Sequence, residues 1–164
     1  MTSGTTQRLD AVWGTSGTDI FAVGDGGTIL HYDGASWAAM TSGTTVTLAG
    51  VWGTSSTNVF AIGSGGTILR YDGTRWSAMA SGTTRGLSGV WGTSATDVFA
   101  VGDNGTILLY DGTTWSALGT GLNSGVLALT LDGTSLYAGG YFATAGGVAA
   151  SRIARWSGTT WAAL

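Results

Sequence analysis

The residues of this chain that could do chemistry are few, and several of them recur at a fixed spacing. Asp33, Asp72 and Asp111 each stand in a YDG triplet, 39 residues apart, so a repeated fold could bring them together as a metal set. An Asp before a Gly also accepts hydrogen bonds from backbone amides of its own turn. We expect this local role for all three residues and predict no metal site.

The sequence contains few other residues that could act in catalysis. There is no Cys, no Glu and one histidine, His31, which removes thiolate nucleophiles and leaves only paired Asp side chains for glycosidase-like chemistry. His31 shares its repeat position with Arg70 and Leu109, residues of unlike chemistry, so we expect it to have a structural role. We predict a protein that is not an enzyme, with no catalytic residues and no cofactor.

Eight tryptophans offer a second kind of site, because the flat face of an indole can stack on a sugar ring. Aromatic side chains that recur along a β protein also fill the space between its sheets, each burying on the order of 150–250 Å². We expect Trp13, Trp52 and Trp91 to be core residues of this kind. A lectin with pockets between repeats is the alternative function.

The composition indicates an all-β protein that does not bind nucleic acid. Thirty Gly, no Pro and abundant Thr and Ser favour short strands joined by glycine turns. All six cations are Arg, all nine anions are Asp and the formal net charge is −3, so no basic surface for nucleic acid is expected. No apolar run reaches the ~18 residues of a membrane-spanning helix. The chain does not start with the charged, apolar and small-residue pattern of a secretory leader, so we expect that a leader was either removed or never present.

A 39-residue repeat organises the sequence. Trp13, Trp52 and Trp91 mark its period, and three consecutive copies are identical in 24 of 39 columns. Such likeness within one chain indicates recent amplification or deliberate construction, and a propeller fragment made in this way need have no evolved ligand. A fourth, divergent copy carries seven additional residues, which we place between its second and third strands.

Each copy predicts four strands. In the first copy they are Leu9–Trp13, Asp19–Val23, Thr28–Tyr32 and Ser36–Met40, joined by turns at GTSGT, GDGG and DGA. In the fourth copy they are Val126–Leu131, Leu136–Gly140, Arg152–Trp156 and Thr160–Leu164. Four strands in about 40 residues is the size of one β-propeller blade, and nearly continuous apolar runs suit sheets covered on both faces. We predict one propeller domain over 1–164, with four-stranded antiparallel blades at approximately 7–41, 46–80, 85–119 and 124–164.

The repeats also resemble a known family. The run VWGTSATDVFAVGDNGTILLYDGTTW (90–115) resembles repeats of bacterial β-propellers of the kelch-like and Asp-box-like kind, and LYAGGYFATAGGVAASRIARWSGTTW (136–161) is similar to a related bacterial propeller repeat. The resemblance implies a fold and not an activity, because propellers carry many unrelated functions. Such repeats often occur in secreted or surface proteins, so the resemblance favours an extracellular or cell-surface location.

Differences between the near-identical copies indicate a binding surface. They gather before the first strand and in the turn between the second and third strands, which a propeller places on one face around its central channel. The predicted ligand-binding residues are Arg8, Asp10, Asp25, Arg85, Asp103 and Asn104. We expect them to lie on one rim and to bind a protein or glycan partner.

The two ends of the sequence suggest how a ring closes. The chain ends at TTWAAL, where an internal copy continues with MTSGTT, and it begins with MTSGTT, so the ends read as halves of one connection. Four blades could close at about 90° per blade, whereas two chains would form eight blades at about 45°, nearer to the roughly 30° at which twisted sheets stack. We predict an eight-bladed homodimer joined head to tail, with a four-bladed monomeric ring as the alternative.

Overall fold

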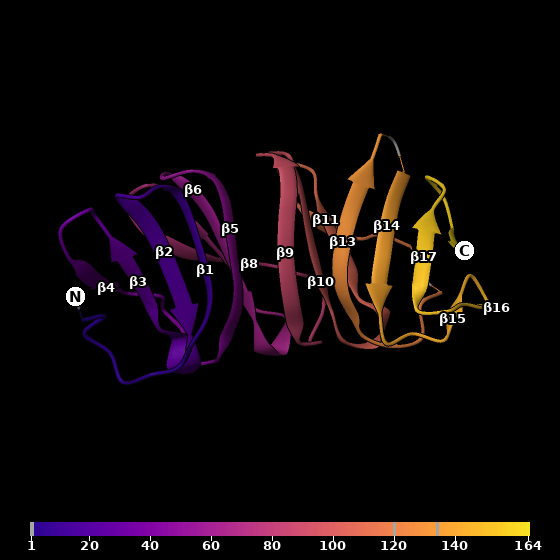
Figure 1. The fold of residues 1–164 in the computed structure, drawn as a ribbon, viewed down its shortest axis with the longest axis horizontal. Helices are drawn as coiled ribbons and strands as arrows, with labels where there is room; N and C mark the ends of the chain where they lie inside the picture. Colours follow the sequence, from indigo (N-terminus) through magenta and orange to yellow (C-terminus); the bar gives the residue numbers. More distant parts are fainter. Residues whose placement is uncertain (1, 120, 134) are drawn as a thin grey trace.

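The chain forms four antiparallel sheets of four strands each, taken in sequence order, in a computed structural model that describes residues 2–119, 121–133 and 135–164 (Figure 1). The first sheet contains β1 (Leu9–Ser16), β2 (Asp19–Gly24), β3 (Ile29–Tyr32) and β4 (Trp37–Met40). The second contains β5 (Leu48–Ser55), β6 (Asn58–Gly63), β7 (Ile68–Tyr71) and β8 (Trp76–Met79). The third contains β9 (Leu87–Ser94), β10 (Asp97–Gly102), β11 (Ile107–Tyr110) and β12 (Trp115–Ala117).

The fourth sheet carries the insertion that the sequence predicts between its second and third strands. Its strands are β13 (Val126–Asp132), β14 (Ser135–Gly140), β17 (Ile153–Trp156) and β18 (Trp161–Ala163). The insertion between β14 and β17 forms a hairpin of β15 (Thr144–Ala145) and β16 (Val148–Ala149). In the other three sheets, single 3-10 turns follow the second strand: η1 (Asp25–Gly27), η2 (Ser64–Gly66) and η3 (Asp103–Gly105).

The turn after the first strand is shorter than the sequence predicted. A turn was expected over 14–18, but β1 continues to Ser16, with Gly14 paired to Ile20 and Ser16 to Asp19. A Cβ atom on Gly14 would lie only 2.5 Å from the backbone oxygen of Asp19. The glycine therefore belongs to β1 and not to the turn, and its missing side chain lets β1 and β2 approach each other closely.

The turn after the second strand receives the linker to the next blade. Gly27 has a φ of 72°, and a Cβ atom there would lie 2.1 Å from the backbone oxygen of Thr44. Only glycine combines this left-handed conformation with so close a contact. Because Thr44 leads into β5, this contact joins the η1 turn of the first blade to the beginning of the second.

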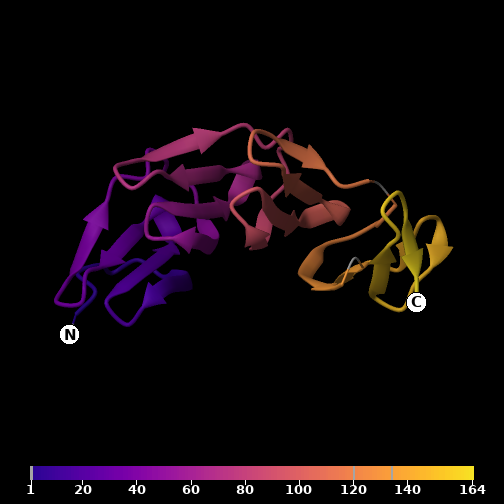
Figure 2. The same ribbon diagram turned by 90° about the horizontal axis from the view of Figure 1, so that it is seen from above.

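The four sheets stack as blades of an open arc (Figure 2). The first strands β1, β5, β9 and β13 lie on its concave side, and the fourth strands lie on its convex side. The first and last blades occupy opposite ends of the arc, with the amino and carboxyl termini far apart (Figure 2). The four-bladed closed ring is therefore not the arrangement that this chain adopts.

The hydrophobic core lies between the blades. At the first junction, Phe21 and Ile29 of the first blade pack with Leu48, Val51 and Trp76 of the second. We call the side of a blade that meets the next blade its leading face, and the side that meets the preceding blade its trailing face. Equivalent clusters fill the second and third junctions, so burial here requires a neighbouring blade.

The tryptophans of the first strands pack against these clusters, as predicted for core residues, but they lie at the edge of the junctions and are only half-buried. The tip of the Trp13 ring lies against Gly53 of the second blade, and Trp52 meets Gly92 of the third in the same way. A Cβ atom on Gly53 or Gly92 would lie 2.9 or 2.7 Å from the Cη2 atom of the facing ring. A tryptophan in one blade therefore requires a glycine in the next.

The fourth blade breaks this pairing. The strand register places Thr130 opposite Tyr137, where the other blades pair a tryptophan with a phenylalanine, and Leu131 in the column of Gly92. Trp91 therefore has no glycine to receive its ring, and it stacks on Phe99 of its own blade with an interplanar angle of 19°. The junction between the third and fourth blades is packed differently from the other two.

Truncation of Trp52 measures what this contact contributes. We expect Trp52→Ala to lower the free energy of unfolding by about 2–3 kcal/mol, below the ~3–5 kcal/mol of fully buried large aromatics, because the ring is half-buried. Ser77→Ala is the control, since Ser77 is exposed on β8 and the first blade has Ala38 in its place. Urea denaturation gives both values, and a loss below about 1 kcal/mol for Trp52→Ala would contradict the packing role.

Candidate functional site

The segment that enters each first strand lies beside the turn that follows the second strand. The Asp25 amide donates to the backbone oxygen of Arg8 at 2.9 Å, and the Asp103 amide donates to that of Gly86, also at 2.9 Å. The second and fourth blades have equivalent bonds. β2 and β14 both run toward the lower edge of the arc in Figure 1, so these connections share one rim, which we call the entry rim.

Three of the predicted ligand-binding residues form a cluster on the entry rim of the first blade. The Arg8 Nε atom lies 2.9 Å from Asp10 Oδ1 and 3.6 Å from Asp25 Oδ2. Thr47 of the second blade donates its hydroxyl to Asp25 Oδ1 at 3.0 Å. Exposed ion pairs of this kind add little to stability, about 0–1 kcal/mol, so the cluster is better suited to recognition than to holding the fold.

The other three predicted residues lie two blades away on the same rim. Asp103 and Asn104 are exposed neighbours in η3. The Asp103 carboxylate lies over the backbone of Gly86, and the exposed Arg85 comes directly before that glycine. Asn104 has a φ of 55°, a conformation that Asn tolerates. Within the described residues, no ion pair or hydrogen bond joins this set to the first-blade cluster. The rim thus presents two separate polar patches.

The inserted hairpin adds an apolar patch that sequence reasoning missed. β15 and β16 lie at the lower edge of the arc in Figure 1, beside the entry rim. Asn123 Oδ1 holds the insertion by accepting from the amides of Ala143 and Thr144, at 2.9 and 3.1 Å. The side chains of Tyr141 and Val148 are largely exposed there. The seven additional residues of the fourth copy were the available signal for a special surface.

The repeated aspartates lie in the turns between third and fourth strands, where they act locally as predicted. Asp111 Oδ1 accepts from the amides of Thr113 and Thr114, each at 2.8 Å, and from the Thr113 hydroxyl at 2.6 Å. These bonds lower the pKa of Asp111 to about 2, the Thr113 hydroxyl contributing most. Asp72 has the same partners in its own turn and a pKa of about 2.

The single histidine and its repeat partner make structural contacts. His31 Nε2 lies 2.7 Å from Asp19 Oδ1 on the neighbouring strand. Arg70, in the same column, donates to Asn58 Oδ1 at 2.8 Å and to the Tyr110 hydroxyl of the next blade at 3.3 Å. Across the part of the chain that the structure describes, no group of three or more His, Cys, Asp or Glu side chains is arranged to hold a metal ion.

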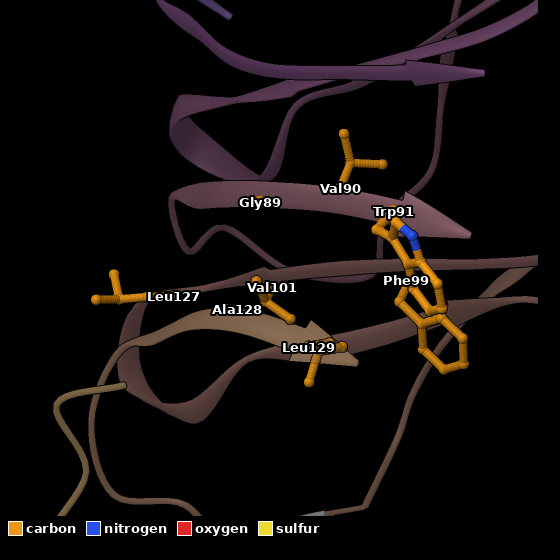
Figure 3. A pocket seen from close by; sticks show the side chains of 8 residues that line it. All are labelled: Gly89, Val90, Trp91, Phe99, Val101, Leu127, Ala128 and Leu129. Carbon is orange, nitrogen blue, oxygen red and sulfur yellow. The ribbon is translucent and has the colours of Figure 1, made fainter. Parts of the chain in front are cut away.

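The altered junction between the third and fourth blades leaves a half-open apolar pocket of about 170 Å³ (Figure 3). Trp91 and Phe99 lie side by side at one end of it, and Leu127 and Leu129 of β13 line the other side. Apart from the indole N–H of Trp91, the side chains that line the pocket have no polar group for a sugar hydroxyl. An apolar cavity of ~150 Å³ holds benzene, so this pocket is large enough for one aromatic ring or branched aliphatic group.

Stacked four-stranded antiparallel blades with their first strands on the concave side define a β-propeller scaffold. None of the helices that the structure describes has the length and apolar character needed to cross a membrane.

Comparisons with known proteins agree with this fold. No protein-family model matches the sequence, and no curated protein matches it. The solved structure of YCF48 from Cyanidioschyzon merolae is similar, with a TM-score of 0.67 and 15% identity over 97% of this chain and 56% of its own. The structure of YCF48 bound to D1 peptide has a TM-score of 0.69 and 16% sequence identity, over 98% of this chain and 54% of its own. The chain spans a little over half the length of these neighbours, and the likeness shows the shared propeller fold.

The turn aspartates predict a pH dependence of stability. The pKa of Asp111 in the folded chain, about 2, lies below its ordinary value of 3.8. The ionised Asp111 side chain therefore stabilises the fold fully above pH 3.8, and this stabilisation is lost as the pH falls through about 2. We expect Asp111→Ala to be less stable than the parent chain at pH 7 and the difference to shrink at pH 2. Ser157→Ala is the matched control, because Ser157 accepts from the Thr160 amide but does not titrate. Denaturation at both pH values tests this, and a constant Asp111→Ala difference would contradict it.

Proposed function

We propose that this protein is a non-enzymatic β-propeller scaffold that binds a protein partner on its entry rim. One observation carries the proposal: copies that are identical in 24 of 39 columns differ, among other positions, in exposed polar residues that meet at this rim. Most of the remaining columns are constant and form the blade and its junctions. Side chains that vary on a constant scaffold are the usual means by which a propeller or a similar framework acquires a ligand.

The chemistry of the rim suits a polypeptide. It carries the Arg8 cluster with charges of both signs, a second patch with Arg85 and Asp103, and the exposed apolar side chains of Tyr141 and Val148. Charged groups that fix orientation, next to aromatic and aliphatic anchors, are typical of protein interfaces. The structure of YCF48 bound to D1 peptide provides an example of a peptide bound by a protein of the same fold.

A glycan ligand is the alternative function. It is favoured by tryptophans at the junctions, and the exposed indole edge of Trp91 in the apolar pocket is the place where a sugar face could stack. Apart from the Trp91 indole, the pocket offers a sugar ring no polar side chain for hydrogen bonding, so it suits an apolar side chain of a peptide better. A glycan array against the purified chain separates the two functions.

The scaffold is further proposed to work as a homodimer in which two chains form one eight-bladed ring. The open arc of Figure 2 supports this assembly, because four blades leave the ring unfinished. A ring of two chains would also repeat the entry rim twice around one channel. Each rim patch would then be presented in duplicate to a partner.

Peptides selected from a phage-displayed random library on the immobilised chain test the rim. We expect the best peptides to bind with micromolar dissociation constants and to lose at least tenfold in affinity for the double variant Arg85→Val, Asn104→Gly. Both replacements are residues that the second blade already has at these positions, Val46 and Gly65, so the fold is kept. Calorimetry measures the affinities.

Arg75→Thr is the matched control for this experiment. Arg75 is exposed in the turn between β7 and β8, at the opposite end of the blade, and the third blade has Thr114 in its place. This variant removes the same charge from the other rim and should leave peptide affinity unchanged. Equal losses for both variants, or no loss for either, would contradict binding at the entry rim.

A further inference from the structure

The trailing face of the first blade is uncovered. Val12 is 68% exposed, whereas Val51, in the same column of the second blade, is 7% exposed because it packs on the first blade. Trp37 is half-buried, although its counterparts Trp76 and Trp161 are 7% and 2% exposed. These positions are apolar in every blade, so the first blade presents to solvent the surface that the others bury.

The leading face of the fourth blade is uncovered in the same way. The register pairs Ile153 with Gly139, just as it pairs Ile29 with Val23, so Ile153 occupies the column of Ile29. Ile29 is 1% exposed against the second blade, while Ile153 is 43% exposed. Leu164, which follows β18, is also 60% exposed. Large exposed apolar residues that gather on one face mark an interaction surface.

The two uncovered faces are complementary because the chain already contains their contact. Within the chain, a Cβ atom on Gly50 of the second blade would lie 3.3 Å from Val90 Cγ1 of the third. Ala128 holds the position of Gly50 in the fourth blade, and Val12 holds that of Val90 in the first. The trailing face of the first blade therefore has the residues that the leading face of the fourth blade would meet in a continued stack.

We infer that these two faces are the halves of one divided blade junction, and that a second copy of this chain completes it. The leading face of the fourth blade, with Ile153 and Ala128, receives the trailing face of the first blade of the second copy, with Val12 and Trp37. A twofold axis along the channel repeats the junction, so both faces of both chains are covered. This inference rests on the proposed homodimer and specifies how its chains join.

Charge placed in either half of the junction tests the assembly. Light scattering at low micromolar concentration should give twice the 16.5 kDa of one chain for the parent protein, and 16.5 kDa for both Val12→Arg and Ile153→Arg. Ser77→Arg is the control, because Ser77 is exposed on β8 of the second blade, which lies at neither end of the arc. A parent chain that stays at 16.5 kDa, or variants that stay paired, would overturn the inference.

Mixing the two variants separates a broken junction from a damaged fold. Each junction of either variant alone contains an arginine, but a mixture can form one junction from the intact fourth blade of Val12→Arg and the intact first blade of Ile153→Arg. At about 100 μM, a two-chain species should therefore return on mixing. If the variants stay single when mixed, the faces are not the two halves of one junction.

A disulfide places the contact between specific residues. Val12→Cys together with Ala128→Cys should form an interchain crosslink on oxidation, because the two sites lie at opposite ends of one arc and adjoin only across the proposed junction. Gly50→Cys together with Val90→Cys supplies the intrachain control at the equivalent internal contact. If the control pair forms its disulfide but Val12→Cys with Ala128→Cys gives no interchain crosslink, the proposed junction is wrong, even where light scattering shows a dimer. Peptide binding to the entry rim is measured separately, so failure of either proposal is recognised by itself.

Discussion

The packing of one blade's apolar face on the next is the interaction on which the rest of this structure depends. Each sheet is thin, and its side chains become buried only where another blade covers them, as Phe21 and Ile29 are by the second blade. At the first two junctions, a tryptophan ring reaches across to a glycine that has no side chain to obstruct it. Stability of a stack of this kind resides in its interfaces more than in its single units.

This constraint separates the scaffold from the surface that binds. The Trp, Phe, Ile and Gly columns are held by the junctions and change little from copy to copy, whereas Arg8, Arg85 and Asn104 lie where no blade covers them. The entry rim can therefore vary without loss of packing. The fourth blade is the exception, because Thr130 and Leu131 replace the tryptophan and glycine that the other blades have at these positions.

Much of the fold could be predicted from the sequence because the repeat is so regular. Spacing gave four strands in each copy and located the insertion of the fourth, and turn chemistry gave the role of Asp72 and Asp111. The entry rim was also predictable, since the two variable segments must lie at the same end of a four-stranded meander. Whether these residues bind a ligand stays a prediction.

Other features could not be predicted because they depend on contacts between copies. The composition of GTSGT suggests a turn, and only the close approach to Asp19 shows why Gly14 belongs to a strand. The half-burial of Trp13 and Trp52 depends on where a ring lies along the junction, which periodicity does not report. The pocket lies at the junction where the fourth blade has Leu131 in the glycine column, and periodicity does not report which residues of two blades meet there.

Electron microscopy of the assembled chain, viewed along the channel axis, tests the central claim most directly. If blade faces must be covered by other blades, averaged images should show a closed ring of eight evenly spaced blades, with two opposite blades that carry the additional density of the β15–β16 hairpin. Single open arcs of four blades, or closed rings of four, would contradict the account.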